Sequence, residues 1–396
     1  MSGFDFDREI QRRNTDSLKY DFAVERGRPG DVLPLWVADM DFPVAPTIQQ
    51  ALIERVQHGI FGYTETKQDY FEALRAWFSV RCGWSPRPEW LIKTPGVVFA
   101  LAMAVKAFTE PGDAVLIQNP VYYPFHEVIQ DNGRRLVNSE LVNRDGRYEI
   151  DFADLEEKLR TERVRLLLLC SPHNPVGRVW SREELRRLAD LCVQYHVVLV
   201  ADEIHCDFVR PGRTFTSAAS LEGEIREQLV ICTAPSKTFN LAGLQVSNIF
   251  IPSEALRGQF RHQVDAAGYS QLNTLGLLAC RVAYETGGDW LDAVKDYLEG
   301  NLAFLRDYLA ERLPEIRLIE PEGTYFAWLD CSGLGLTKEE LNDLVINRAK
   351  LWLDAGHIFG AASEQYQRVV LACTRRTLTQ ALDQLASAVA ERKKEN

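Results

Sequence analysis

Short apolar runs alternate with amphipathic stretches through the middle of the chain, and this alternation predicts strands connected by helices. The apolar runs are flanked by Gly, Pro, Asn or Asp, as is typical of buried strands. The segment Ser181–Tyr195 has helical periodicity, with Ser181 as N-cap and Glu184 completing a capping box. Such alternation favours a mostly parallel sheet with helices on both faces. The predicted strands are Ala114–Gln118, Leu166–Cys170, Val197–Ala201, Leu229–Cys232 and Ser247–Ile251.

The C-terminal part of the chain has a different pattern, in which helices and strands do not alternate regularly. This α+β order indicates a second, smaller domain. We expect a large domain over residues 46–285 and a small domain made of residues 1–45 and 286–396. The elements predicted in the C-terminal part are helices at Trp290–Arg312, Lys338–Ala355 and Leu378–Glu391, and strands at Ile316–Glu320, Tyr325–Asp330 and Val369–Ala372.

Composition and charge narrow the class of protein. Apolar residues make up 46% and charged residues 26% of the chain, which is ordinary for a soluble globular protein. The net charge of −11 and the absence of a basic stripe, apart from Arg392–Lys394, argue against a nucleic-acid partner. The longest apolar run, Val97–Val105, is too short to cross a membrane, and the N-terminus lacks the pattern of a signal peptide.

The eight cysteines contain no C-x-x-C pair, so the sequence predicts no zinc ribbon and no other metal site. Several of them lie inside apolar runs. We therefore expect buried, reduced thiols in a cytoplasmic protein.

Five segments with polar side chains follow predicted strands or lie where a strand leads into a helix. In an open α/β sheet, the carboxyl ends of the strands line the ligand crevice. These segments can therefore converge although they are far apart in sequence. They are Thr94–Val98, Asn119–Tyr122, Ser171–Gly177, Ala201–His205 and Ala234–Asn240.

Two of these segments contain ionisable side chains that suit chemistry with an aromatic cofactor. Asp202 follows an apolar strand, where a carboxylate needs a cation or donor and could keep a pyridine nitrogen protonated. An N-cap or a surface ion pair is the simpler alternative for Asp202 alone. Lys237 lies among small and apolar residues, so desolvation could lower its pKa and free the amine as a nucleophile. A solvated loop lysine is the alternative there.

The remaining segments give weaker signals when each is taken alone. Gly96 precedes a helical run, whose first N–H groups and dipole suit a phosphate, although glycine before a helix is more often simple turn chemistry. Asn174 between two prolines is usually a turn residue, and Tyr122 is usually a core or interface aromatic. The ordered combination is much more specific than any single segment.

That combination resembles the fold type I pyridoxal-5′-phosphate (PLP) enzymes of the class I/II aminotransferase superfamily, over essentially the whole chain. The resemblance is carried by Ser236–Gly243, His173–Gly177 and Asp202-Glu203. Trp36–Pro43 and Asp202–His205 are similar to the MalY/PatB group of cystathionine or cysteine-S-conjugate β-lyases. The resemblance implies the PLP-dependent transferase fold, an α/β fold with a mostly parallel sheet of seven-stranded type between helices and a smaller α+β domain.

The resemblance also implies roles around the cofactor ring. Lys237 is expected to hold PLP covalently as an imine and to move the Cα proton of the substrate. Asp202 is expected to pair with the pyridine nitrogen. Asn174 and His205 are expected at the phenolic oxygen, and Tyr122 is expected to stack on the ring.

Further implied roles concern the phosphate, the substrate and the oligomer. Gly96, Val97, Val98 and Ser236 are expected to hold the phosphate, and Tyr63 to reach the phosphate of a neighbouring subunit, which implies a homodimer with shared active sites. Arg375, with Arg376 as an alternative, is expected to clamp the substrate α-carboxylate through its planar guanidinium, beside Asn174. Tyr122, Tyr123 or Tyr63 could assist the departing sulfur.

The predicted function is a β-lyase that converts an S-substituted cysteine such as cystathionine into a thiol, pyruvate and ammonia. A departure from the aminotransferase pattern favours it: Gln245 stands where aminotransferases carry an arginine for the phosphate. Ala234 and the segment Phe359–Arg368 also depart from that pattern. An aminotransferase on the same residues is the main alternative. A regulatory or binding protein that retains PLP is the second.

Overall fold

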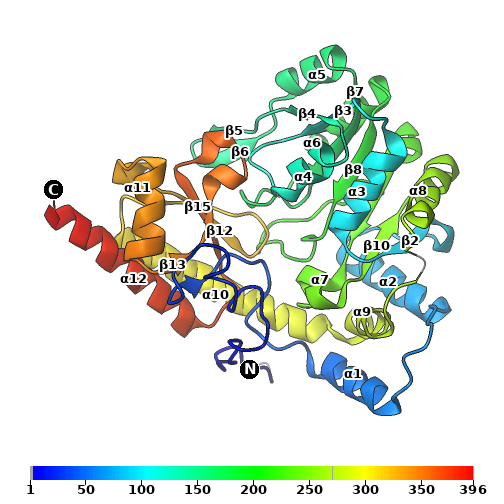
Figure 1. Ribbon diagram of the computed structural model, residues 1–396. Coiled ribbons are helices and arrows are strands. Elements are labelled where there is room, and N and C mark those ends of the chain that lie inside the picture. Colours follow the sequence, from blue (N-terminus) through cyan, green and yellow to red (C-terminus); the bar gives the residue numbers. More distant parts are fainter. Residues whose placement is uncertain (1–2, 270, 396) are drawn as a thin grey trace.

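The centre of the computed structural model, which describes residues 3–269 and 271–395, is a seven-stranded sheet (Figure 1). The strand β10 runs antiparallel to both of its neighbours, and the other neighbouring strands are parallel. The predicted fold class and its five predicted strands are confirmed. The spatial order is β2 (Leu91–Thr94), β10 (Ser247–Phe250), β9 (Leu229–Thr233), β8 (Val198–Asp202), β7 (Val164–Cys170), β3 (Ala114–Ile117) and β4 (Arg135–Asn138).

Both faces of this sheet are apolar and covered by helices. Along β7, Leu166 and Leu168 belong to one buried cluster, while Leu167 and Leu169 belong to the other. Such alternation follows from the two-residue period of a strand. The first cluster includes α3 (Val97–Phe108), α4 (Pro124–Gln130) and α8 (Glu254–Ala266), and the second includes α2 (Gln68–Arg81), α5 (Phe152–Thr161), α6 (Arg182–Gln194) and α9 (Thr274–Thr286).

Local sequence signals account for several helix boundaries. The predicted capping box is present at α6, where the Ser181 hydroxyl accepts from the backbone N–H of Glu184 and the Glu184 side chain accepts in return. Helix α1 (Pro46–His58) has proline in its first turn and ends at Gly59, which adopts the left-handed conformation.

A second, antiparallel sheet is formed by the C-terminal part of the chain. Helices α10 (Gly288–Arg312) and α12 (Arg375–Glu395) pack beside it (Figure 1). The N-terminal strand β1 (Leu33–Pro34) pairs in parallel with β13 (Leu351–Trp352), which supports our proposal that residues 1–45 belong with residues 286–396. The strand order is β11 (Arg317–Ile319), β12 (Phe326–Asp330), β15 (Tyr366–Val370) and β14 (Asp354–Ala355).

The predicted helix over Lys338–Ala355 is wrong in its second half. Helix α11 (Lys338–Asp343) continues as a π-helical turn over Leu344–Arg348, and Lys350 then adopts a left-handed φ of 53°. The following residues form β13 and β14 instead. The strand partner of β13, β1, is distant in sequence, and β14 pairs with the later strand β15, so the helical periodicity gives no sign of either pairing.

Gly177 lies in the loop after β7, where this loop packs against residues 321–323 of the second sheet region and leaves no space for a side chain. Its φ is 72°, and its carbonyl accepts from the N–H groups of Glu322 and Gly323 at 2.8 and 2.9 Å. An added Cβ would lie 2.6 Å from Cβ of Pro321. The glycine that ends the His173–Gly177 motif is therefore required by close packing between the two parts of the chain.

All eight cysteines are buried and free, as the sequence predicted. The helices of residues 3–269 and 271–395 include none with the length and apolar character that crossing a membrane requires.

Candidate active site

The carboxyl ends of three neighbouring parallel strands bring most of the candidate residues to one edge of the sheet. Cys170, Asp202 and Cys232 are aligned across β7, β8 and β9. The chain leaves these strand ends toward Asn174, His205 and Lys237. The structure therefore gathers residues that are spread over positions 174 to 237 of the sequence.

Lys237 lies on the short helix α7 (Pro235–Thr238), directly after β9. Its Nζ donates to the backbone carbonyl of Ala38 at 2.7 Å. Burial and the positive charge of Arg368 lower the pKa of Lys237 to about 8, although Asp39 and Asp202 act in the opposite direction. A useful fraction of the amine is thus neutral near physiological pH, as a nucleophile or a general base requires.

Asp202 is the last residue of β8 and is almost fully buried. One carboxylate oxygen accepts from the backbone N–H of Ile204 at 3.2 Å. Burial raises the pKa of Asp202 to about 7. None of the ion pairs in the described part of the chain includes this carboxylate. Its environment therefore favours a cationic partner, such as a protonated ring nitrogen.

His205 provides a neutral, buried imidazole three residues further on. Its ring makes edge-on contacts with Tyr325 and Phe326, with centroids 5.7 and 5.2 Å away. Burial holds the pKa of His205 well below its ordinary value. Nδ1 is buried, and the described residues give it no hydrogen-bond partner. An orphaned polar atom at this edge suits a bound group with an oxygen or hydroxyl.

Asn174 is fixed by two contacts that leave its amide nitrogen as a donor. Its backbone N–H donates to Sγ of Cys170 at 3.3 Å, and its Oδ1 accepts from Arg368 at 2.9 Å. Tyr122, which follows β3, is half-buried with its ring centroid 5.3 Å from that of Tyr123. Burial raises the pKa of Tyr122, so its hydroxyl stays protonated.

Arg368 is a buried arginine beside Asn174 that the sequence prediction did not include. It lies on β15, only 2% exposed, between the rings of Phe326 and Phe359. Its guanidinium donates to Asn174, to the carbonyl of Trp36 at 2.8 Å and to the carboxylate of Asp354. Nε is buried and has no partner among the described residues. The sequence signal was an arginine directly before the apolar run Val369–Cys373, because a charge that is buried with such a run requires partners.

That Arg375 clamps the substrate stays a prediction, and the structure gives this residue partners other than Asn174. Arg375 begins α12, where its Nε donates to Asn301 at 2.9 Å and its guanidinium lies 4.6 Å from the ring centroid of Phe304. The alternative, Arg376, is 80% exposed and pairs with Glu9. The structure places Arg368 in contact with Asn174, whereas Arg375 and Arg376 contact other residues.

The residues expected at a phosphate lie at two helix starts. Helix α3 begins at Val97 after Gly96, whose φ is 137°, and no side chain caps it. Gly96 N–H donates to Oγ of Ser247 at 3.1 Å. The N–H groups of Val97 and Val98 lie in the uncapped first turn of the helix, so they are suited to an anion. Ser236 lies in the first turn of α7, after β9, which is two strands away from β2.

Tyr63 lies apart from this group in the single chain. It follows α1 in the connection to α2 and is 98% exposed, beside the exposed Ile60 and Phe61. A tyrosine with so little contact to its own chain fits a position in an interface between subunits.

Comparison with known proteins identifies the family of this chain. The family model for aminotransferase class I and II matches residues 30–385. The chain therefore belongs to the class I and II aminotransferase family, and the predicted placement near MalY and PatB is confirmed. It is 42% identical to cystathionine β-lyase PatB of Bacillus subtilis, over 97% of this chain and 99% of that protein. It is 31% identical to protein MalY of Escherichia coli, over 98% and 99%.

Among solved structures, the fold is similar to that of cystalysin from Treponema denticola, which contains a pyridoxal 5′-phosphate cofactor. The TM-score is 0.94 with 36% sequence identity, and the alignment covers 98% of this chain and 99% of cystalysin. The PLP-dependent transferase fold that the sequence predicted is thus confirmed.

Replacing Asp202 by Asn should stabilise the ligand-free chain at alkaline pH. The pKa of Asp202 is higher in the folded chain than in the unfolded chain, so stability is lost as the pH rises from about 4 through about 7. Asp202→Asn removes this loss, which is on the order of 4 kcal/mol above that range. Denaturant unfolding at about pH 4 and about pH 8 should show a gain only at the higher pH.

Asp207→Asn is the matched control for this prediction. Asp207 is also buried, but it accepts hydrogen bonds from Trp77 at 3.1 Å and Thr238 at 2.7 Å. Burial raises the pKa of Asp207 as well, but its replacement also breaks one of these hydrogen bonds, so the chain should lose stability at the lower pH and gain less than Asp202→Asn at the higher pH. A loss of stability in Asp202→Asn at alkaline pH would contradict our description of Asp202.

Proposed function

We propose that this protein is a PLP-dependent carbon–sulfur lyase that acts on S-substituted cysteines such as cystathionine. The observation that carries the proposal is a partly neutral Lys237 amine together with a buried Asp202 carboxylate that forms no ion pair with any described residue. PLP supplies an aldehyde for the amine and a ring nitrogen for the carboxylate. The orphaned Nδ1 of His205 further supports the fit of this group.

The residues around the cofactor would divide the work of holding it. Lys237 would hold it covalently, and Asp202 would keep its ring nitrogen protonated. Asn174 and His205 would contact the ring oxygen, and Tyr122 would stack on the ring. The phosphate would be held by Gly96, Val97, Val98 and Ser236. The bound ring withdraws electrons from the substrate Cα, which makes the Cα proton acidic.

Elimination requires a base for the Cα proton and a leaving group at Cβ. The free amine of Lys237 would be the base, because its lowered pKa leaves a neutral amine available. The C–S bond breaks and the sulfur leaves as a thiol. With one water consumed, the remaining three carbons become pyruvate and the nitrogen becomes ammonia.

Arg368 would bind the substrate α-carboxylate. Two of its nitrogen atoms are already fixed by Asn174, Trp36 and Asp354, so the guanidinium plane is oriented before substrate arrives. Its Nε has no partner among the described residues and remains as a donor. A rigid planar cation is suited to a carboxylate.

A homodimer with shared active sites completes the proposal. The exposed Tyr63 supports it, together with the apolar Ile60 and Phe61 beside it. In such a dimer, Tyr63 would reach the phosphate in the neighbouring subunit. We also propose a cytoplasmic location, which is supported by eight free, buried thiols.

Elimination is favoured over transamination by two observations. PatB and cystalysin share more than a third of their residues with this chain, and PatB is a cystathionine β-lyase. Gln245 also stands where the aminotransferase pattern has an arginine for the phosphate.

A product assay tests elimination directly. The purified protein with PLP and cystathionine should release pyruvate and homocysteine without any 2-oxo acid, since elimination needs no amino acceptor. Turnover that depends on an added 2-oxo acid would identify an aminotransferase instead. A protein that retains PLP but gives no turnover under either condition would support a binding role.

Arg368→Lys should raise KM for cystathionine about 10- to 100-fold, because lysine keeps the charge but loses the planar arrangement of donors. Arg375→Lys is the matched control and should change KM by less than about threefold, because Arg375 contacts Asn301 and Phe304. Steady-state kinetics of both variants would test the assignment. The opposite order of effects would restore Arg375 as the clamp.

A further inference from the structure

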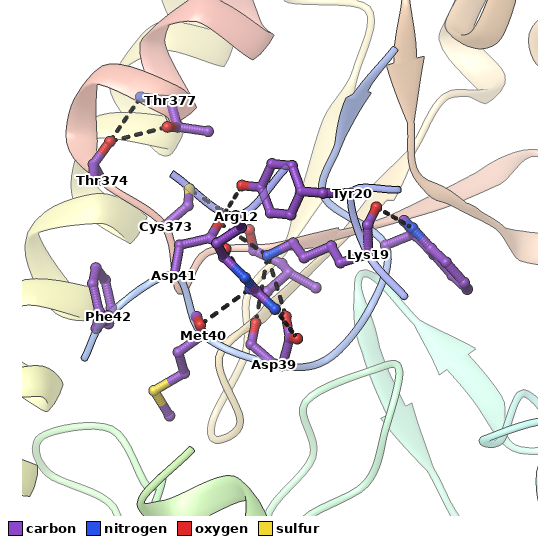
Figure 2. A network of polar contacts seen from close by, with 12 residues as sticks. Arg12, Lys19, Tyr20, Asp39, Met40, Asp41, Phe42, Cys373, Thr374 and Thr377 are labelled. Carbon is purple, nitrogen blue, oxygen red and sulfur yellow. Dashed lines mark hydrogen bonds and ion pairs between the residues drawn. The ribbon is translucent and has the colours of Figure 1, made fainter. Parts of the chain in front are cut away.

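A cluster of charged residues in the N-terminal part of the chain lies against the segment that contacts Lys237. Figure 2 shows Arg12, Lys19 and Tyr20 gathered around the carboxylates of Asp39 and Asp41. We call these five residues the N-terminal clasp. Two cations and two carboxylates balance each other in charge, and the Lys19 side chain is completely buried.

The clasp holds Asp39 in one orientation. Arg12 donates from Nη1 and Nη2 to the two carboxylate oxygens of Asp39, at 3.0 and 2.6 Å. Lys19 Nζ lies 3.5 Å from Oδ1 of Asp39 and donates to Asp41 at 3.0 Å. Burial alone would raise the pKa of Asp39, but Arg12 and Lys19 lower it below its ordinary value. Asp39 is therefore a fixed negative charge at physiological pH.

Both neighbours of Asp39 in the chain are bonded to the turn that contains Lys237. The carbonyl of Ala38 accepts from Lys237 Nζ at 2.7 Å. Met40 donates its N–H to Asn240 at 3.0 Å and accepts from the Asn240 amide at 3.0 Å. The backbone at Asp39 is thus held between two hydrogen-bonded residues, and Asp39 directly follows the residue whose carbonyl accepts from the Lys237 amine.

Five charged or titratable groups on different segments act on the Lys237 amine or bind the Ala38 carbonyl that accepts from it. Arg368 on β15 lowers its proton affinity, while Asp202 on β8 and Asp39 raise it. His205 is neutral. Burial raises the pKa of Tyr325, so its hydroxyl stays protonated and donates to the same Ala38 carbonyl at 3.0 Å. A protonated ring nitrogen would neutralise Asp202, and Asp39 would then be left to offset Arg368.

We propose that Asp39, held in place by Arg12 and Lys19, is the counter-charge that sets the basicity of the Lys237 amine. Asp39 is a positioning residue in this account, since it acts through Lys237 and the substrate does not need to touch it. The inference rests on the proposed function only for the role of Lys237 as a base. The proton affinity of the amine itself can be measured without PLP.

The test is the pH dependence of acylation at Lys237. The full-length chain without added cofactor is labelled briefly with acetic anhydride across a pH series, and Lys237 is followed by peptide mass spectrometry. The wild-type midpoint should lie near 8. Asp39→Asn should move it down by about one pH unit, because the nearby negative charge is lost. In Asp39→Glu the midpoint should lie close to the wild-type value, because glutamate keeps the negative charge.

Asp41→Asn is the matched control. It removes a carboxylate from the same clasp, and it breaks contacts to Arg12, Lys19 and Tyr20. It should lower the thermal unfolding midpoint but leave the Lys237 midpoint close to that of the wild type. Equal shifts in Asp39→Asn and Asp41→Asn, or no shift in Asp39→Asn, would overturn the proposal.

The failure of the proposed function would look different. Each variant is also incubated with PLP, and covalent capture at Lys237 is followed by absorbance. A wild-type chain that captures no PLP contradicts the proposed function, whereas the difference in acylation midpoint between Asp39→Asn and the wild type still decides the role of Asp39.

Discussion

Burial of opposite charges at one edge of the parallel sheet is the constraint on which the site depends. Asp202 loses its solvation at the end of β8, and burial raises its pKa to about 7. Lys237, one strand further along, is also desolvated, and its pKa falls to about 8. Each group is held in a state that is costly alone. A ligand that supplies a cation to the carboxylate and a carbonyl carbon to the amine relieves both costs.

The second part of the fold closes this edge with residues from both ends of the chain. Arg368 comes from β15 and bonds to Asn174 of the large sheet and to the carbonyl of Trp36 in the N-terminal segment. The same segment offers the Ala38 carbonyl to Lys237. The parallel pairing of β1 with β13 holds that segment beside the second sheet. The surroundings of Asn174 and Lys237 therefore depend on residues that are distant in sequence.

Local patterns were sufficient for the sheet and for the residues at its strand ends. The apolar runs and the Ser181 capping box depend on neighbours within a few positions, so they can be read from the sequence. Arg375 and Arg368 show where that limit lies, because the contacts of each arginine are made with partners far along the chain, Asn301 and Asn174. The predicted helix over Lys338–Ala355 was wrong for the same reason. The clasp around Asp39 gave no periodic signal.

Covalent trapping at Lys237 is the measurement that tests the central claim most directly. The protein is saturated with PLP, reduced with borohydride and digested, and the peptide containing Lys237 is analysed by mass spectrometry. We expect a pyridoxyl group on Lys237 in the wild type and none on that peptide in Lys237→Ala. A wild-type protein that stays colourless, or that carries the label only on other lysines, would contradict the account.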